Sequence, residues 1–198
     1  MSLASHRAAA IDGAILAGGR GRRMGGADKG WILWQGRPLV EQVAERLRPQ
    51  VGRLLISANR NLERYAALGA AVVADERAGQ GEFAGPLAGM LAVLRQARGD
   101  WVAFVPCDAP ALPRALVARL AEAGAGTRAA VATCGGVVQP VFCLLPRTLA
   151  PRLQELLEQG ERRPQEMLRQ VGAVAVPFAD AAAFANINEA GGEPADGR

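Results

Sequence analysis

A glycine-rich, basic segment follows the first strand-like run of this 198-residue chain. It reads LAGGRGRRMGGADKG over residues 16–30 and contains six glycines, three arginines and the single lysine of the sequence. Because glycine has no Cβ, successive backbone N–H groups can approach an anion closely, and the four cations add positive charge. An exposed turn would not need this many cations. The segment therefore predicts a phosphate-binding loop.

Two common phosphate-binding motifs do not fit this segment. A G-x-G-x-x-G dinucleotide fingerprint would begin at Gly19 but meets Met24 at its last position, and no acidic residue ends the second predicted strand. A Walker A loop requires Gly-Lys-Ser/Thr, whereas Lys29 stands between Asp28 and Gly30. Hydride transfer on a dinucleotide and P-loop hydrolysis are both disfavoured.

Asp108 follows a continuous apolar run at 101–106. A carboxylate at the end of a buried strand is costly unless a cation meets it, and Mg²⁺ is commonly held by one or two carboxylates plus substrate phosphates. The alternative is an N-cap for a helix starting at Pro113, although the distance makes capping awkward. Cys107 has no histidine to activate it, because the one histidine, His6, lies in the N-terminal tail. Asp108 is therefore the candidate metal ligand, and Ser-His-Asp or Cys-His catalysis is disfavoured.

A second acidic residue, Asp75, follows a short strand-like run at 70–74. A carboxylate can accept hydrogen bonds from both N1–H and N2–H₂ of guanine, which adenine and cytosine cannot reproduce. Gly85 permits a flat base to approach the backbone closely. Together these residues favour guanine recognition, and a surface turn is the alternative for Asp75.

The composition separates a few polar residues from the background. Arginine (22 residues) far exceeds lysine (one), a bias expected of a GC-rich coding sequence that suppresses Lys and Asn. The lysine and all four asparagines nonetheless fall in three short segments, at Lys29, Asn59, Asn61, Asn186 and Asn188. These residues are candidates for function, with a turn position as the alternative for Asn61 and Asn186.

Charge and composition also exclude several protein classes. The net charge is +4, but no long basic run carries interleaved aromatics, so nucleic-acid binding is disfavoured. Three cysteines without C-x-x-C spacing argue against a disulfide framework or a zinc site. No apolar run approaches the roughly 20 residues needed to cross a bilayer, and the N-terminus lacks the apolar core of a secretory signal. We therefore expect a cytoplasmic protein that is not bound to membranes.

Strand-like runs alternate with helical periodicity, which predicts an α/β domain with a mostly parallel sheet. Strands are predicted at 11–16, 53–57, 70–74, 101–106 and 174–176, with a hairpin formed by 129–133 and 137–145. Helices are predicted from about Pro38 to before Pro49, after Pro86, from Pro113, and over 149–157. Residues 1–10 are predicted as a tail, 11–188 as a single domain and 189–198 as a flexible C-terminal tail. The candidate residues follow the strands, where ligands collect in open α/β sheets.

Taken together, these motifs resemble the molybdenum cofactor guanylyltransferases of the nucleotidyltransferase superfamily. The resemblance runs from Ile15 to about Asn188. It rests on LAGG at 16–19, RMGGxDKG at 23–30, GxPL at 36–39, PQV at 49–51, SANR at 57–60, GPLAG at 85–89, PCD at 106–108, GERR at 160–163 and NIN at 186–188. LAGG alone marks only the superfamily, whereas RMGGxDKG together with PCD and GERR is much more specific.

The resemblance implies a Rossmann-like three-layer fold of the nucleotidyltransferase type. It implies transfer of GMP from GTP to the terminal phosphate of molybdenum-bound molybdopterin. The implied GTP site comprises Leu16, Ala17, Gly18, Gly19, Lys29, Ser57, Asn59, Asp75, Gly85 and Asp108. Asp108 would bind Mg²⁺, Lys29 and Arg23 would act with it in catalysis, and the acceptor would meet Arg162, Arg163, Asn186 and Asn188. Molybdenum-insertion proteins and molybdoenzyme chaperones are the implied protein partners.

Two motifs depart from the family pattern. Ser57 stands where the family often has asparagine, and the ending Asn-x-Asn-Thr-Pro-Glu becomes Asn-Ile-Asn-Glu-Ala-Gly-Gly here, so we expect a short or disordered C-terminal element. Three alternative functions stay open at this point. They are the cytidylyltransferase of the same cofactor pathway, a sugar-1-phosphate nucleotidyltransferase, and a non-catalytic GTP-binding or RNA-binding module.

Overall fold

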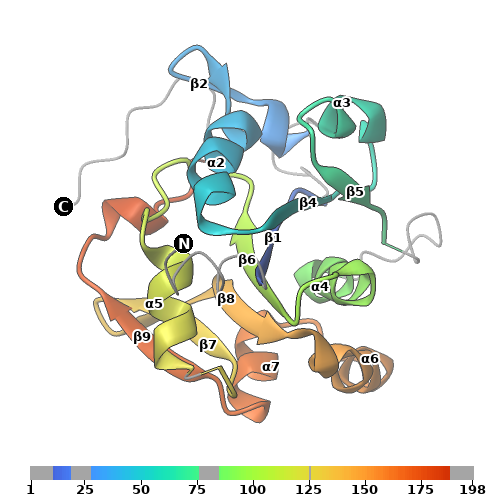
Figure 1. Cartoon of the computed structure of the whole chain (residues 1–198), viewed down its shortest axis with the longest axis vertical. Coiled ribbons are helices and arrows are strands. Elements are labelled where there is room, and N and C mark those ends of the chain that lie inside the picture. The colour runs from blue at the N-terminus through green and yellow to red at the C-terminus, as the bar shows by residue number, and fades with distance from the viewer. Residues whose placement is uncertain (1–10, 19–27, 76–84, 125, 188–198) are drawn as a thin grey trace.

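A seven-stranded sheet runs through the computed structural model, which describes residues 11–18, 28–75, 85–124 and 126–187 (Figure 1). The strands lie in the order β5, β4, β1, β6, β8, β7, β9. Their bounds are β1 Ile11–Leu16, β4 Arg53–Ser57, β5 Ala71–Val73, β6 Trp101–Pro106, β7 Ala130–Cys134, β8 Val137–Pro146 and β9 Val174–Phe178. Among the strands that the structure describes in this sheet, only β8 runs antiparallel to its neighbours. The predicted mostly parallel sheet is confirmed.

Helices cover both faces of the sheet and complete the three layers that the resemblance implied. Their bounds are α2 Leu39–Leu47, α3 Leu62–Ala66, α4 Gly85–Gln96, α5 Leu116–Ala123, α6 Ala150–Glu158 and α7 Pro164–Gln170. One hydrophobic core joins α2, α3 and α5 to the sheet, and a second joins α4, α6 and α7 to it. In Figure 1, α4 and α6 lie side by side, in agreement with their contacts.

The structure differs from the sequence prediction mainly at short elements. Helix α5 begins at Leu116 rather than Pro113, and its second backbone N–H, that of Val117, donates to the side chain of Gln50 (3.1 Å). Helix α3, helix α7 and the small hairpin of β2 (Leu33–Trp34) and β3 (Arg37–Pro38) were not predicted. They are too short to show the i, i+3, i+4, i+7 apolar pattern from which the longer helices were predicted.

The register of the parallel strands sets where their ends meet. Leu16, the last residue of β1, lies opposite Ser57 of β4 on one side and Pro106 of β6 on the other. Ser57 in turn lies opposite Val73 of β5. Because β4 and β6 lie on opposite sides of β1, the carboxyl ends of these strands form the topological switch point, where open α/β sheets bind ligands.

At the amino ends of the strands, a buried carboxylate has a structural role. Asp12 is 2% exposed, and its Oδ2 accepts hydrogen bonds from the backbone N–H groups of Arg98 (2.7 Å) and Gly99 (3.1 Å). These bonds tie the start of β1 to the turn between α4 and β6. Across the described parts of the chain, the helices are too short or too polar to traverse a bilayer.

Candidate active site

The segments that follow β1, β4, β5 and β6 remain joined beyond the strand ends. The N–H of Ala17 donates to the carbonyl of Ser57 (2.8 Å), and the N–H of Cys107 donates to the carbonyl of Leu16 (3.2 Å). The N–H of Ala58 donates to the carbonyl of Val73 (3.0 Å). These bonds extend the sheet to the backbone of Leu16, Ala17 and Ser57, which are three of the predicted GTP residues.

Lys29 and Asp108 meet at this edge. The Nζ atom of Lys29 contacts Oδ2 of Asp108, and their side chains are 26% and 9% exposed. Lys29 begins a short 3₁₀ helix that ends at Trp31, whereas Asp108 follows β6. The two charged residues singled out from the sequence are thus brought together by the fold.

The other oxygen of Asp108 is poorly satisfied. Oδ1 of Asp108 is buried and accepts no hydrogen bond from the described residues. A buried carboxylate oxygen without a partner carries a desolvation penalty that a cation would remove. One such oxygen fits a Mg²⁺ ion that takes its remaining ligands from phosphates and water, as this ion commonly does. Among the described residues, no cluster of three or more His, Cys, Asp or Glu offers a fuller protein cage.

Asn59, which follows β4, is hydrogen-bonded to the segment that follows β5. Its Oδ1 accepts a hydrogen bond from the backbone N–H of Asp75 (2.8 Å). Its Nδ2 lies on the side of Gly18, at 3.6 Å from the position that a Cβ on this glycine would occupy. Asn59 therefore positions the backbone of Asp75, the predicted guanine contact.

Ser57 is packed more tightly than a surface polar residue. It is 3% exposed, and a Cβ added to Gly89 of α4 would lie 2.6 Å from its hydroxyl oxygen. The helix approaches the strand closely here because Gly89 has no side chain. The predicted contact between Ser57 and the nucleotide stays a prediction.

Gly85 lies against the Gly-Glu-Arg-Arg turn. The backbone of Gly85 has a φ of +70°, and an added Cβ would lie 3.3 Å from the carbonyl oxygen of Arg162. This left-handed conformation and this close approach both favour glycine. The structure thus brings a predicted GTP residue next to a predicted acceptor residue that is far away in sequence.

Glu161 organises the Gly-Glu-Arg-Arg turn. Its carboxylate oxygen Oε1 accepts hydrogen bonds from the backbone N–H groups of Arg162 (2.9 Å) and Arg163 (2.8 Å) and from Nε of Arg163 (3.1 Å). The side-chain hydrogen bonds from Arg163, followed by those backbone bonds, lower the pKa of Glu161 to about 2. Arg162 donates from Nη1 to the carbonyls of Leu157 (2.7 Å) and Glu161 (2.8 Å). The side chain of Arg163 is 77% exposed and its guanidinium pairs with Glu161, so the two arginines are held differently.

The end of the described chain also reaches the site. The N–H of Ile187 donates to the backbone carbonyl of Asp108 (2.8 Å), which places Asn186 in the segment beside the candidate metal ligand. Three predicted site residues, Gly19, Arg23 and Asn188, lie outside the described residues.

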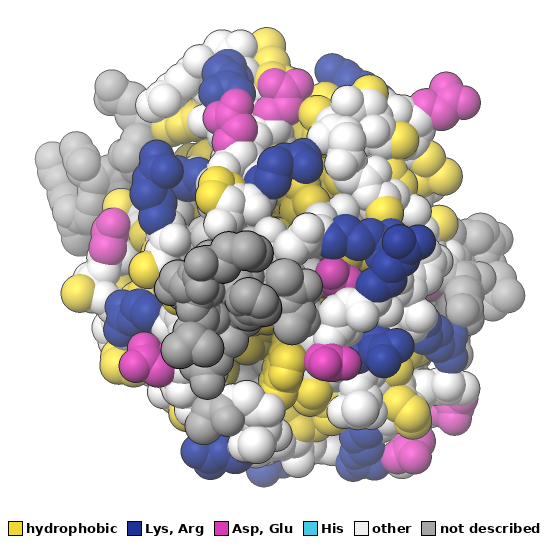
Figure 2. Space-filling view, in the orientation of Figure 1, with side chains coloured by type: hydrophobic (Ala, Val, Ile, Leu, Met, Phe, Trp, Pro, Cys, Tyr) yellow, Lys and Arg dark blue, Asp and Glu magenta, His cyan; other side chains and the backbone are white. Residues whose placement is uncertain are grey.

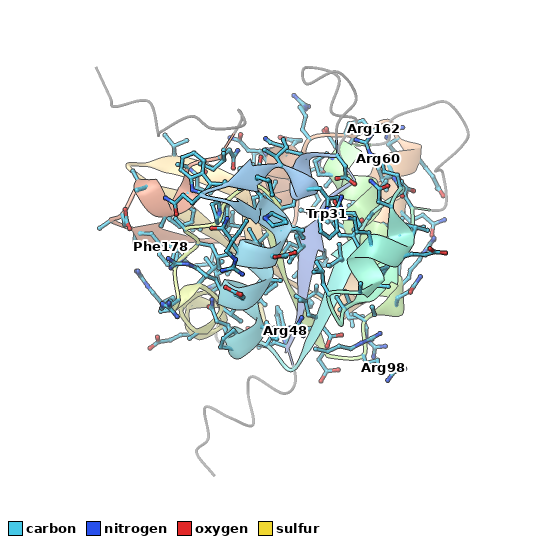
Figure 3. All side chains as sticks on the ribbon, turned by 90° about the horizontal axis from the view of Figure 1, so that it is seen from above. Trp31, Arg48, Arg60, Arg98, Arg162 and Phe178 are labelled. Atoms are coloured by element: carbon cyan, nitrogen blue, oxygen red, sulfur yellow. The ribbon has the colours of Figure 1, made fainter. Side chains whose placement is uncertain are left out.

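Figure 3 separates the two ends of the strands. Trp31, Arg60 and Arg162 lie toward the end to which β1 points, whereas Arg48 and Arg98 lie toward the opposite end. On the face seen in Figure 2, basic and acidic side chains of the described residues are interspersed rather than gathered into one basic surface. The candidate site is therefore defined by its residues at one edge of the sheet.

One network of the site is not indicated by the sequence. The carboxylate of Asp28 accepts hydrogen bonds from Asn61 and Tyr65, and no sequence motif links these two residues to the Asp-Lys-Gly block. The Asp-Lys-Gly block was the available signal for Asp28. Cys107 is buried, and burial raises the pKa of its thiol well above the ordinary value, which agrees with a packing role.

The chain matches known proteins over most of its length. Residues 13–174 match the family model described as a MobA-like NTP transferase domain. A molybdenum cofactor guanylyltransferase of Serratia proteamaculans is 48% identical over 179 residues, covering 90% of this chain and 89% of the relative. A protein of the same name from Ralstonia nicotianae is 47% identical over 189 residues, covering 90% and 91%.

Solved structures share the fold at lower identity. The molybdopterin-guanine dinucleotide biosynthesis protein A of Archaeoglobus fulgidus superposes with a TM-score of 0.70 at 24% identity, covering 89% of this chain and 92% of that one. A nucleotidyl transferase from Methanothermobacter thermautotroptrophicus gives 0.70 at 22% identity, covering 90% and 91%. With relatives close to half identical along most of its length, the chain belongs to the MobA-like NTP transferase family and, within it, to the molybdenum cofactor guanylyltransferases.

Proposed function

We propose that this protein transfers GMP from GTP to the terminal phosphate of molybdenum-bound molybdopterin and releases pyrophosphate. The names of the relatives at 47–48% identity support the reaction. The geometric observation that carries the proposal is the contact between Lys29 and Asp108 at the carboxyl ends of the strands. A cation and a carboxylate at one point suit a ligand that carries both negative phosphates and a metal.

The reaction joins two anions, so their repulsion must be offset before they can meet in line. An oxygen of the acceptor phosphate forms a bond to the α-phosphorus of GTP, and the bond from that phosphorus to the bridging oxygen of the β-phosphate breaks. The acceptor phosphate is already ionised at neutral pH, so no general base is needed. This agrees with a site in which the described residues include no histidine.

We assign Lys29 to the phosphates of GTP. Its ammonium group would leave Oδ2 of Asp108 and donate to phosphate oxygens, where it would stabilise the charge that develops on the pyrophosphate. Arg23 would add charge to the same phosphates. Asp108 would hold Mg²⁺ through Oδ1, its unpartnered oxygen. When bound, Mg²⁺ supplies positive charge that neutralises the phosphate oxygens.

Base selection is assigned to Asp75. Asn59 accepts a 2.8 Å hydrogen bond from the backbone N–H of Asp75, so the backbone from which the carboxylate extends is held beyond β5. A carboxylate accepts from N1–H and N2–H₂ of guanine, whereas cytosine has no such pair of donors. Gly85 would let the flat base lie close to the backbone at the start of α4.

The acceptor is assigned to the side of the site formed by Arg162, Arg163, Asn186 and Asn188. The proximity of Gly85 to the carbonyl of Arg162, and of Ile187 to Asp108, supports this placement. The exposed guanidinium of Arg163 is suited to a phosphate of the pterin. Proteins that insert molybdenum, and chaperones of molybdoenzymes, remain proposed partners.

The function is tested by supplying purified protein with Mg²⁺, molybdenum-bound molybdopterin and either GTP, CTP or ATP, and by measuring pyrophosphate. The proposal predicts release with GTP and formation of the guanine dinucleotide. Release with CTP alone would identify a cytidylyltransferase instead. Nucleotide binding without turnover, accompanied by salt-dependent RNA affinity, would contradict the enzymatic assignment.

A further inference from the structure

Asp28, which precedes Lys29, accepts three hydrogen bonds. Its Oδ1 accepts from the hydroxyl of Tyr65 (2.6 Å) and from the backbone N–H of Gly30 (3.3 Å), and its Oδ2 accepts from Nδ2 of Asn61 (2.8 Å). Asp28 is thereby the N-cap of the 3₁₀ helix Lys29–Trp31. The residues on both sides of Lys29 are therefore tied to the segment that contains α3.

Tyr65 is the most deeply anchored member of this network. It is 0% exposed, and its ring lies 5.1 Å from that of Trp31 between centroids. A Cβ added to Gly30 would lie 2.5 Å from the Tyr65 hydroxyl, so the backbone of Gly30 fits closely against this group. Burial, followed by the hydrogen bond to Asp28, raises the pKa of Tyr65 well above its ordinary value. Tyr65 thus stays a neutral donor throughout the accessible pH range.

Asn61 presents its amide from an unusual backbone conformation. Its φ of +52° lies in the left-handed region, which asparagine tolerates better than most residues. Asn61 stands directly before α3, and its side chain forms no cap with that helix. Its amide donates to Asp28 instead, so this turn serves the lysine segment as well as the helix.

We propose that Tyr65 and Asn61 are positioning residues that act through Asp28 to hold Lys29 toward the triphosphate. The inference rests on the proposed role of Lys29. A lysine side chain has many rotamers, and binding a phosphate with it costs conformational entropy. Ordering the backbone of the residue adds to this cost, and the contacts of Asp28 and Gly30 remove that backbone part before the ligand arrives. The contacts of Tyr65 and Asn61 with Asp28 require no contact of their own with the substrate.

The test is a double-mutant cycle of Tyr65→Phe and Lys29→Met, read by calorimetric binding of GTP with Mg²⁺. Tyr65→Phe keeps the buried ring and removes only the hydroxyl. We expect it to weaken binding about 5- to 30-fold in the presence of Lys29 and less than about twofold in the Lys29→Met background. Equal losses in both backgrounds would overturn the proposal, because Tyr65 would then act on the fold in general.

A second variant and a control keep the test independent of one mutation. Asn61→Gly allows the same left-handed backbone and removes the amide, so it should show the same dependence on Lys29. Gln50→Ala removes hydrogen bonds that Gln50 forms with Arg46, Pro113 and Val117, away from the site. The control should leave the affinity for GTP within about twofold.

The single lysine of the chain offers a readout that needs no nucleotide. Selective ¹⁵N-lysine labelling gives one lysine backbone signal, which belongs to Lys29. Tyr65→Phe and Asn61→Gly should shift or broaden this signal, whereas Gln50→Ala should not. An unchanged signal in both site variants would overturn the positioning role. If the wild type binds CTP rather than GTP, the guanine assignment fails, and the same cycle with CTP still decides the role of Tyr65.

Discussion

Nζ of Lys29 contacts Oδ2 of Asp108, whereas Oδ1 of the same carboxylate is buried and unpartnered among the described residues. The carboxylate thus carries one oxygen neutralised by the lysine and one that lacks a partner. We infer that Lys29 and Asp108 each neutralise the charge of the other in this structure. Metal-bound triphosphate would satisfy both groups by giving phosphates to Lys29 and a cation to Asp108.

Replacement of Asp108 tests the metal-binding role. We expect Asp108→Asn to lower kcat with GTP by about 10²–10³-fold, because an amide oxygen lacks the charge that holds the metal near the phosphates. Asp12→Asn is the matched control, since Asp12 is also a buried carboxylate but lies at the opposite edge of the sheet. Steady-state pyrophosphate release measures both. Retained turnover of Asp108→Asn at saturating Mg²⁺ would remove Asp108 from the reaction.

Replacement of Lys29 should change metal binding and nucleotide binding in opposite directions. Lys29→Met removes the cation that competes for Asp108, so the affinity of the free protein for Mn²⁺ should rise about three- to tenfold. The affinity for GTP with Mg²⁺ should fall, because the phosphates lose their partner. Titration of Mn²⁺ by electron paramagnetic resonance and calorimetry with GTP measure the two effects. A fall in both affinities would argue against the exchange of partners at Asp108.

Gln50 is expected to stabilise the fold without contributing to the reaction. Its Oε1 accepts from the N–H of Val117 near the start of α5, and its Nε2 donates to the carbonyl of Pro113 (3.1 Å). Helix α5 has no side-chain cap of its own. Gln50→Ala should therefore lower the free energy of unfolding by about 1–2 kcal/mol. Denaturant unfolding measures it, with the surface variant Gln154→Ala as a control expected within about 0.5 kcal/mol.

The Gly-Glu-Arg-Arg turn should lose stability in acid. Arg163 lowers the pKa of Glu161 to about 2 from the ordinary 4.5, so the folded protein favours the charged form of Glu161 more than the unfolded chain does. The stabilisation is present above about pH 4.5 and is lost as the pH falls toward 2. Glu161→Gln should lower the Tm at pH 7, and the difference from wild type should shrink steadily between pH 4.5 and 2. A difference independent of pH over this range would contradict this account.

The ends of β1, β4 and β6 could be predicted from the sequence because each of these strands is a short, mostly apolar run. The runs at 11–16, 53–57 and 101–106 agree with β1, β4 and β6 residue for residue. Because the carboxyl ends of parallel strands lie together, the sequence was enough to expect Lys29, Asp75 and Asp108 in one region. Contacts that depend on packing could not be predicted, such as the closeness of Gly85 to Arg162.

The contacts of Tyr65 and Asn61 with Asp28, beside Lys29, could not be predicted from the sequence for a similar reason. Helix α3 spans only Leu62–Ala66, so its apolar pattern is too short to predict a helix. Without that helix, nothing indicates that Tyr65 is buried or that its hydroxyl faces Asp28. Asn61, for which a turn position was the alternative, is the N-cap residue of α3 with a φ of +52°, and its bond to Asp28 depends on tertiary structure.

A crystal structure with Mn²⁺ and a GTP analogue that cannot be cleaved between its α- and β-phosphates tests the central claim most directly. The account predicts one bound nucleotide whose triphosphate accepts hydrogen bonds from Lys29 and shares its metal with Asp108. It also predicts that the two side chains are no longer in contact with each other. A nucleotide bound elsewhere, with Lys29 still on Asp108, would contradict the account.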